Sequence, residues 1–142
     1  MKTIAEILHD KGRDIWSISP DASVYEAIEL MALKGIGALI VLEGGDPVGM
    51  ISERDYARKV ILKGRSSKDT TIREIMSSPV IFTDTGKSVE ACMELMTEKH
   101  IRHLPVLNDN KLVAVISIGD LVKAIIDEQK FVIEQLESYI AS

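Results

Sequence analysis

Apolar positions along the chain form short strand-like runs in two similar groups. Each group contains two apolar runs separated by turn-forming residues, a pattern typical of a β-hairpin. The predicted hairpin strands are residues 38–42 with 47–51, and 104–107 with 112–116. A shorter apolar run precedes each hairpin, at residues 16–18 and 80–82, and predicts one further strand per group.

Helical spacing fills the remaining segments. Apolar residues recur at helical intervals after Ser23 and after Ser88, so each serine is expected to cap a helix with one buried stripe. Closing helices are predicted over about residues 53–63 and from residue 118 onward. The last pattern continues to residue 140, so the second closing helix is expected to extend beyond the first. Its apolar tail predicts a self-association interface or, as the alternative, a docking face for another protein.

The two groups are copies of one unit. At an offset of 65 residues, 23–61 aligns with 88–126 without a gap, with 15 identities in 39 pairs. Each copy is predicted to run β-α-β-β-α, with repeat 1 at 1–65, repeat 2 at 66–127 and a helical extension at 128–142. A single copy would bury little core. The expected fold is therefore α/β (α+β), with the two repeats packed sheet to sheet around a pseudo-twofold axis and clefts between them.

Composition excludes several classes of protein. Apolar residues make up 46 % of the chain and charged residues 27 %, as in globular domains, and no apolar run approaches membrane-spanning length. The net charge of −5 argues against general nucleic-acid binding. The single cysteine, Cys92, falls in an apolar helical stripe and is expected to be buried. A lone cysteine and the lack of a signal-peptide pattern predict a cytoplasmic protein.

The pattern S-x-x-D occurs at both strand-to-helix junctions. It comprises Ser52 with Asp55, and Ser117 with Gly119 and Asp120. One interpretation is a capping box at the start of each closing helix. The other is a ligand site, because a helix N-terminus attracts anions and a carboxylate one turn in can accept hydrogen bonds from a ribose. The two interpretations are compatible.

Basic residues distinguish the second copy from the first. Arg102 and His103 stand where the first copy has Gly37 and Ala38. Arginine can contact phosphate with two parallel hydrogen bonds, and histidine adds a donor whose charge depends on pH. The pair predicts a phosphate site beside Asp120; the alternative is a solvated basic strand end.

Other candidate chemistry is sparse. The segment 63–71 is rich in glycine, serine and charge, so it is expected to be a plain linker or else a flap over a phosphate or a nicotinamide-ribose. Three scattered histidines argue against a metal site. Serine and cysteine lack a histidine partner in a recognisable motif, and we expect no catalytic activity.

The residues described so far resemble the cystathionine-β-synthase (CBS) domain family, as the tandem pair called a Bateman module. The resemblance covers residues 4 to about 126. Its specific parts are the I-x-x-I-M leader at 72–76, the R-H-L-P-V strand at 102–106 and the I-S-x-x-D junctions. Residues 51–61, 64–70 and 115–122 and the terminal helix are similar to a stand-alone group that binds AMP or NAD.

The resemblance implies a regulatory adenine-nucleotide sensor that often forms homodimers. It implies that Asp120 holds the ribose and that Ser117, Arg102 and His103 contact phosphate. It places Thr83, Ile101 and Pro105 around the adenine. In the first repeat, Asp55 and Ser52 match the pattern, but the basic pair is absent, so that site would depend on Arg54 and Arg58.

The expected function is thus an AMP- or NAD(H)-binding energy or redox sensor that regulates another protein. The alternative is a dimerisation or interaction scaffold that binds no ligand.

Overall fold

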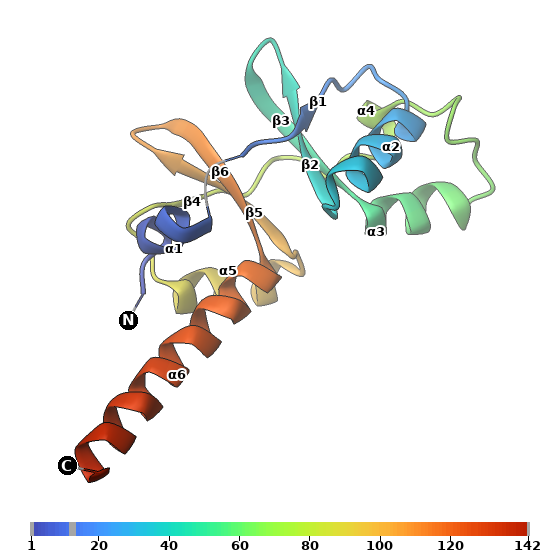
Figure 1. The fold of residues 1–142 in the computed structure, drawn as a ribbon. Helices are drawn as coiled ribbons and strands as arrows, with labels where there is room; N and C mark the ends of the chain where they lie inside the picture. Colours follow the sequence, from blue (N-terminus) through green and yellow to red (C-terminus); the bar gives the residue numbers. More distant parts are fainter. Residues whose placement is uncertain (1, 12–13, 142) are drawn as a thin grey trace. The chain divides into compact units, whose positions relative to one another are not determined.

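The computed structural model describes residues 2–11 and 14–141, which form two compact packing units (Figure 1). The central unit is Ile15–Ile81. The terminal unit combines Met1–Asp14 with Phe82–Ser142. Each unit has its own three-stranded sheet.

The central unit is built around the sheet β1-β2-β3, in which β1 is parallel to β2 and β2 is antiparallel to β3. Its elements are β1 (Ser17–Ile18), α2 (Val24–Lys34), β2 (Ala38–Glu43), β3 (Asp46–Ser52), α3 (Glu53–Tyr56), the π-helix η1 (Ala57–Ile61) and α4 (Ile72–Ile75).

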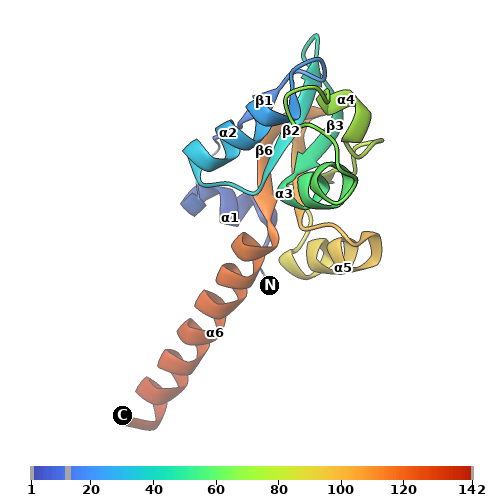
Figure 2. The same cartoon turned by 90° about the vertical axis from the view of Figure 1, so that its right-hand side faces the viewer.

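The terminal unit repeats this plan with the sheet β4-β5-β6. Its elements are α1 (Ile4–Lys11), β4 (Thr83–Asp84), α5 (Val89–Lys99), β5 (His103–Asn108), β6 (Lys111–Ser117) and α6 (Ile118–Ala141). Helix α6 extends well past α1 and α5 of its own unit in both ribbon views (Figures 1 and 2). The predicted long closing helix is thereby confirmed.

Both predicted hairpins are present, and their turns follow from backbone chemistry. Gly44 and Gly45 have φ of 58° and 87°, and Asp109 and Asn110 have φ of 53° and 62°. Two successive residues with positive φ form the turn whose twist matches antiparallel strands, and glycine, asparagine and aspartate adopt it most readily. The preceding helices α2 and α5 begin after Ser23 and Ser88, each of which accepts a hydrogen bond from the amide three residues on. They end at Gly35 and His100, both in the left-handed conformation.

The strand predicted at 80–82 is wrong, because strand β4 covers Thr83–Asp84 instead. Ser77 is still held by the central unit, where its amide donates to the Met50 carbonyl at 2.9 Å and its carbonyl accepts from the Met50 amide at 3.0 Å. The chain then enters the terminal unit at Phe82. Pairing with β5 therefore begins only at Thr83, opposite Val106.

The first closing helix is also irregular. In place of one α-helix over 53–63, a four-residue α-helix is followed by the π-helical turn Ala57–Ile61. The segment after it is no loose linker. Val24 and Tyr25 donate their amides to the carbonyls of Thr70 and Ser67, both at 2.9 Å, so this segment closes over the start of α2.

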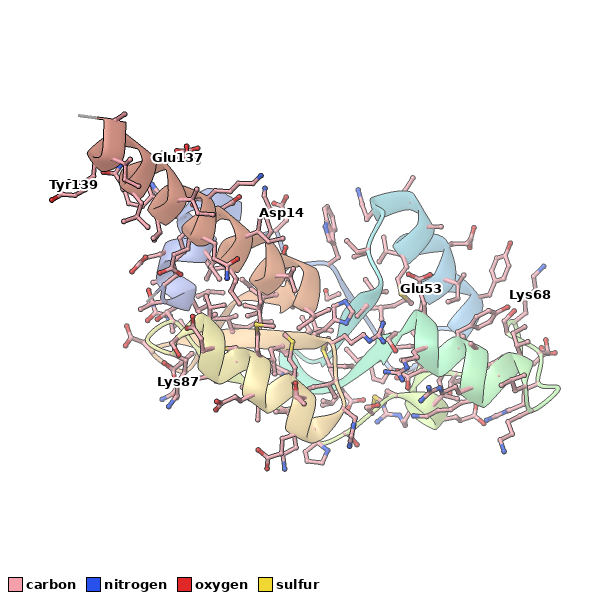
Figure 3. All side chains as sticks on the ribbon, turned by 90° about the horizontal axis from the view of Figure 1, so that it is seen from below. Asp14, Glu53, Lys68, Lys87, Glu137 and Tyr139 are labelled. Atoms are coloured by element: carbon pink, nitrogen blue, oxygen red, sulfur yellow. The ribbon has the colours of Figure 1, made fainter. Side chains whose placement is uncertain are left out.

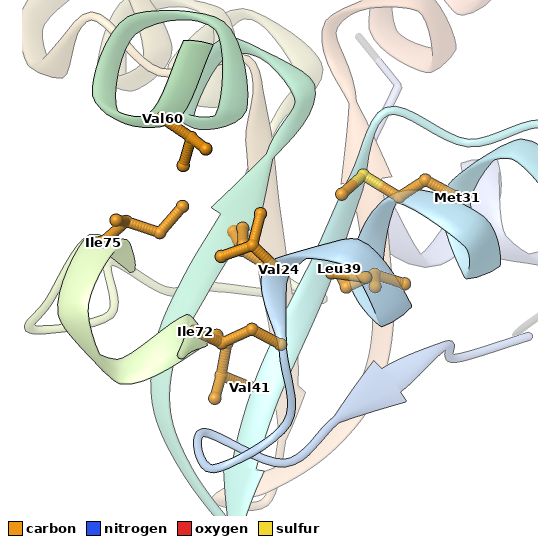
Figure 4. Close-up of a cluster of buried hydrophobic side chains, with 9 residues drawn as sticks. Val24, Met31, Leu39, Val41, Val60, Ile72 and Ile75 are labelled. Atoms are coloured by element: carbon orange, nitrogen blue, oxygen red, sulfur yellow. The ribbon is translucent and has the colours of Figure 1, made fainter. Parts of the chain in front are cut away.

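The two leader helices exchange places between the packing units. The second leader, α4, contributes Ile72 and Ile75 to the core of the central unit (Figure 4). The first leader, α1, joins the terminal unit, where the Ile4 amide donates to the Lys87 carbonyl at 2.9 Å. A sequence repeat and a packing unit are therefore different divisions of this chain.

Each unit has a core of aliphatic side chains between its helices and one sheet face. In the central unit, the completely buried residues include Val24, Leu39, Val41 and Val60 (Figure 4). The predicted α+β class, with two three-stranded sheets and a long C-terminal helix, is confirmed. The packing of one sheet against the other around a pseudo-twofold axis stays a prediction.

Candidate functional site

The acidic end of the candidate site lies where β6 passes into α6. The Ser117 amide donates to Asp120 Oδ2 at 2.7 Å, and the Asp120 amide donates to Ser117 Oγ at 3.2 Å. This reciprocal pair is the capping box that the sequence predicts. It fixes the Asp120 carboxylate in the first turn of a 24-residue helix, where the helix dipole favours negative charge.

The basic residues Arg102 and His103 lie next to this junction. His103 is opposite Ser117 in the register of β5 and β6, and the Ile118 amide donates to the Arg102 carbonyl at 2.8 Å. The Arg102 side chain is exposed, and that of His103 is half-buried. The hairpin thus brings the cationic start of β5 and the acidic start of α6 together at one end.

The three residues assigned to the adenine occupy different depths. Ile101 is half-buried just before β5, and Pro105 is buried opposite Val115. Thr83 is 93 % buried, and its hydroxyl lies 3.1 Å from the Cys92 sulfur. Burial raises the pKa of the Cys92 thiol, so Cys92 is a poor nucleophile, as its expected core position implies.

In the central unit, Ser52 and Asp55 form the matching junction. The Ser52 amide and hydroxyl donate to Asp55 Oδ2 at 2.9 Å and 3.1 Å, and the Asp55 amide donates to Ser52 Oγ at 3.2 Å. The Glu53 amide donates to the Gly37 carbonyl at 3.0 Å, so the backbone geometry is that of the second repeat.

A lysine that the sequence interpretation missed sets this junction apart. Lys59 Nζ lies 3.2 Å from Asp55 Oδ1 and donates to the Ile75 carbonyl at 2.8 Å. Both Asp55 oxygens therefore have partners within the central unit. The equivalent position in the second repeat is Ala124, so the i, i+4 spacing of Asp55 and Lys59 was the signal to look for.

The predicted cations of the first repeat are exposed. Arg54 lies in α3 and Arg58 in η1, both on the solvent side of this short helical segment. Two basic residues of the following segment are engaged: Arg65 pairs with Glu74 at 2.5 Å, and Lys68 lies 4.9 Å from the centre of the Tyr25 ring. Those contacts argue against a phosphate flap built from residues 63–71.

A groove of about 590 Å³ in the terminal unit lies away from the capping box. It runs beside α5, and Thr83 is the one member of the predicted site along it. Its charged lining residues are Asp84, Lys87, Glu94, Glu98 and Asp109. Four carboxylates against one lysine disfavour a phosphate here.

Neither a metal site nor a membrane-spanning helix occurs within residues 2–11 and 14–141. Nowhere in these ranges do three histidine, cysteine, aspartate or glutamate side chains gather as a metal site. Within the same ranges, the helices are too short or too polar to cross a membrane.

Comparison with known proteins identifies a family. The chain matches the family model described as CBS domain twice, over residues 4–62 and 72–127. The solved structure of a putative signal-transduction protein with CBS domains from Burkholderia ambifaria is 52 % identical. The match covers 90 % of this chain and 96 % of that one, with a TM-score of 0.87.

Two more distant relatives widen the comparison. The mitochondrial CBS domain-containing protein CBSX3 of Arabidopsis thaliana is 36 % identical over 97 % of this chain and 71 % of its own length. The CBS domain pair of protein MJ0100, solved in complex with 5-methylthioadenosine and S-adenosyl-L-methionine, shares the fold. It is 22 % identical, with a TM-score of 0.79 over 90 % of this chain and 98 % of that one.

Proposed function

The chain belongs to the CBS domain family, and on that premise we propose that it is a regulatory module that binds an adenine nucleotide. AMP or NAD(H) is the proposed ligand, and the proposed role is to sense energy or redox state for another protein. The module is proposed to be non-catalytic, to act in the cytoplasm and to self-associate.

The observation that carries this proposal is the juxtaposition at the end of the β5–β6 hairpin. A nucleotide needs cationic donors for its phosphate and an acceptor for its ribose hydroxyls. Arg102 and His103 supply the donors, Asp120 supplies the acceptor, and the start of α6 adds the amides of a helix N-terminus, with Gly119 in its first turn. Ser117 orients the carboxylate through the capping box.

The remaining assignments extend this arrangement. Ile101 and Pro105 would contact the adenine base, with Thr83 at the inner limit of the site. The complex of MJ0100 with two adenosine-containing compounds supports the same class of ligand. We propose that the fold places an adenosine in both proteins, with the phosphate preference here set by Arg102 and His103.

The first repeat is proposed to bind the same ligand more weakly. Asp55 and Ser52 have the required geometry, but Gly37 and Ala38 stand where the second repeat has Arg102 and His103. Arg54 and Arg58 are the cations available for a phosphate at this repeat.

A calorimetric titration of the Asp120→Asn variant tests the assignment. Loss of the charged acceptor is expected to weaken AMP binding by about 1–3 kcal/mol, roughly 5- to 150-fold. Asp55→Asn is the matched control, and it should change the affinity of the tighter site less than twofold. Unchanged AMP affinity in Asp120→Asn, or a larger loss in Asp55→Asn, would remove Asp120 from the site.

The scaffold alternative makes a different prediction. A ligand at 100 times its Kd should add about 2.7 kcal/mol to the free energy of unfolding. We expect AMP or NAD(H) to raise the melting temperature within a panel that also contains ADP, ATP and S-adenosylmethionine. If none of these compounds raises it, the module is a scaffold.

A further inference from the structure

The C-terminal part of α6 is an exposed helix surface. The residues that α6 buries, Leu121 and Ala124, lie in its first two turns. Every residue from position 129 to position 141 is exposed. The exposed fractions of its large apolar side chains are high: Ile133 53 %, Leu136 57 % and Ile140 81 %. A stable helix of this composition needs a partner surface.

The exposed apolar residues follow a seven-residue period. If Ile126 is position a, then Ile133 and Ile140 are also a, and Val122, Gln129 and Leu136 are d. This set, the α6 seam, is the hydrophobic a/d stripe of a two-helix coiled coil with a single polar position, Gln129. The α6 seam is distinct from the face of α6 that packs within the terminal unit. The buried residues of that face, Leu121 and Ala124, occupy heptad positions c and f. Phe131 also lies elsewhere, in a hollow with Lys2 and Glu6 of the leader.

The residues flanking the seam indicate which helix covers it. The exposed end of α6, residues 129–141, is called the overhang here. Its e positions are Lys130 and Glu137, and its g positions are Val132 and Tyr139. Figure 3 shows Glu137 and Tyr139 on opposite sides of the end of α6. In an antiparallel pair of these helices, e faces e and g faces g. Lys130 of each chain would then lie beside the partner's Glu137, which gives two ion pairs per dimer. Val132 of each chain would contact the partner's Tyr139.

A parallel pair would lack this match. In a parallel pair, each e position faces a g position of the partner. Lys130 would then lie against the partner's Ile125, and Glu137 would lie against the partner's Val132. The length of the overhang also fits the antiparallel pair. With Ile133 opposite the partner's Leu136, Gln129 falls opposite the partner's Ile140, and the paired stretch spans residues 129–140. Every residue of that stretch is exposed.

We propose that the α6 seam of one chain packs antiparallel on that of a second copy, with reciprocal Lys130–Glu137 ion pairs on one side. The proposal deepens the expectation of self-association and is independent of nucleotide binding, so either can fail alone.

Zero-length carbodiimide cross-linking of the full chain tests the geometry directly. Chains of natural isotope content and ¹⁵N-labelled chains are mixed and cross-linked, and the products are identified by mass spectrometry. We expect a Lys130–Glu137 link between a labelled and an unlabelled peptide. Within one chain these residues lie two helical turns apart, about 10 Å along the axis, so the labelled–unlabelled pairing is what identifies a link between chains. A cross-linked dimer without this mixed peptide would overturn the proposal.

A charge-exchange series measures the energetic consequence by sedimentation equilibrium. Glu137→Lys and Lys130→Glu each place like charges together twice, and each is expected to weaken dimerisation at least fivefold. The double variant Lys130→Glu/Glu137→Lys restores the opposite pairing and should recover the original Kd. Glu134→Lys makes the same charge change off the seam and should leave the Kd within twofold. No loss in the single variants, or no recovery in the double variant, contradicts the antiparallel pair.

Discussion

At the scale of single residues, the strand-to-helix junctions of the two repeats have the same backbone geometry but differ in a few side chains. Asp55 and Asp120 occupy the same backbone position and accept the same capping hydrogen bonds. Lys59 pairs with Asp55, whereas its equivalent in the second repeat is an alanine. The two junctions therefore share a backbone geometry but differ in the side chains beside the carboxylate, so duplication of the fold does not duplicate the chemistry.

Gly49 is a second residue-scale difference, because β3 passes very close to the segment after α4. A Cβ atom at position 49 would lie 3.0 Å from the Ser77 carbonyl oxygen and 2.6 Å from the Met76 sulfur. The Met76 side chain can move, but the Ser77 carbonyl is held by its hydrogen bond with Met50. We expect Gly49→Ala to destabilise the protein by about 1–3 kcal/mol in urea unfolding.

The equivalent position in the second repeat is Ala114, which provides the control. Ala114→Gly should cost about 1–2 kcal/mol, because glycine weakens a strand by about 0.5–1 kcal/mol and the buried Ala114 methyl is lost as well. Equal stability of Gly49→Ala and the unmodified protein would show that the contact relaxes without cost.

At the scale of elements, short helices in this chain depend on their caps. Helix α4 has four residues and would be unstable alone. Thr71 and Glu74 form a capping box in which Glu74 Oε2 accepts from the Thr71 amide at 2.7 Å, and Arg65 pairs with Oε1. Glu74 therefore stabilises the start of helix α4 and, through Arg65, also holds the segment 63–71 in place.

This cap makes stability depend on pH. The Thr71 amide, followed by Arg65 and the Thr71 hydroxyl, lowers the pKa of Glu74 below 4.5. A carboxyl whose pKa is lowered by folding stabilises the protein above its ordinary pKa, and that contribution is lost as the pH falls through the lowered value. We expect Glu74→Gln to lower the free energy of unfolding at pH 7. We also expect that free energy to fall less steeply in the variant as the pH is lowered into the acid range.

Chemical unfolding between pH 3 and pH 7 measures this effect. Glu98→Gln, an exposed position on α5, is the control and should keep the original pH dependence. Parallel curves for Glu74→Gln and the unmodified protein would exclude Glu74 as the titrating group.

At the scale of the whole molecule, the exchanged leaders connect each packing unit to the sequence of the other repeat. Ile72, which is completely buried, completes the core of the central unit, and Ile4, equally buried, belongs to the terminal unit. Neither repeat of the sequence therefore contains a whole core.

The exchange predicts where a leader substitution loosens the structure. Ile72→Ala should cost about 2–5 kcal/mol and speed amide hydrogen exchange in β2 and β3 more than in β5 and β6. Ile4→Ala should show the opposite distribution. The same strands responding to both substitutions would contradict separate cores.

The sequence by itself determined both hairpins, the caps at Ser23 and Ser88, the long α6 and the S-x-x-D junctions. These features depend on periodicity and on residues within one turn or one hairpin, where local chemistry decides. Tertiary structure decided which core each leader enters, where β4 begins and that Lys59 bridges Asp55 to the Ile75 carbonyl. Both leaders have similar apolar spacing, so local pattern cannot assign them. Contacts between residues distant in the chain choose the partner, because they bury the apolar side chains of each leader.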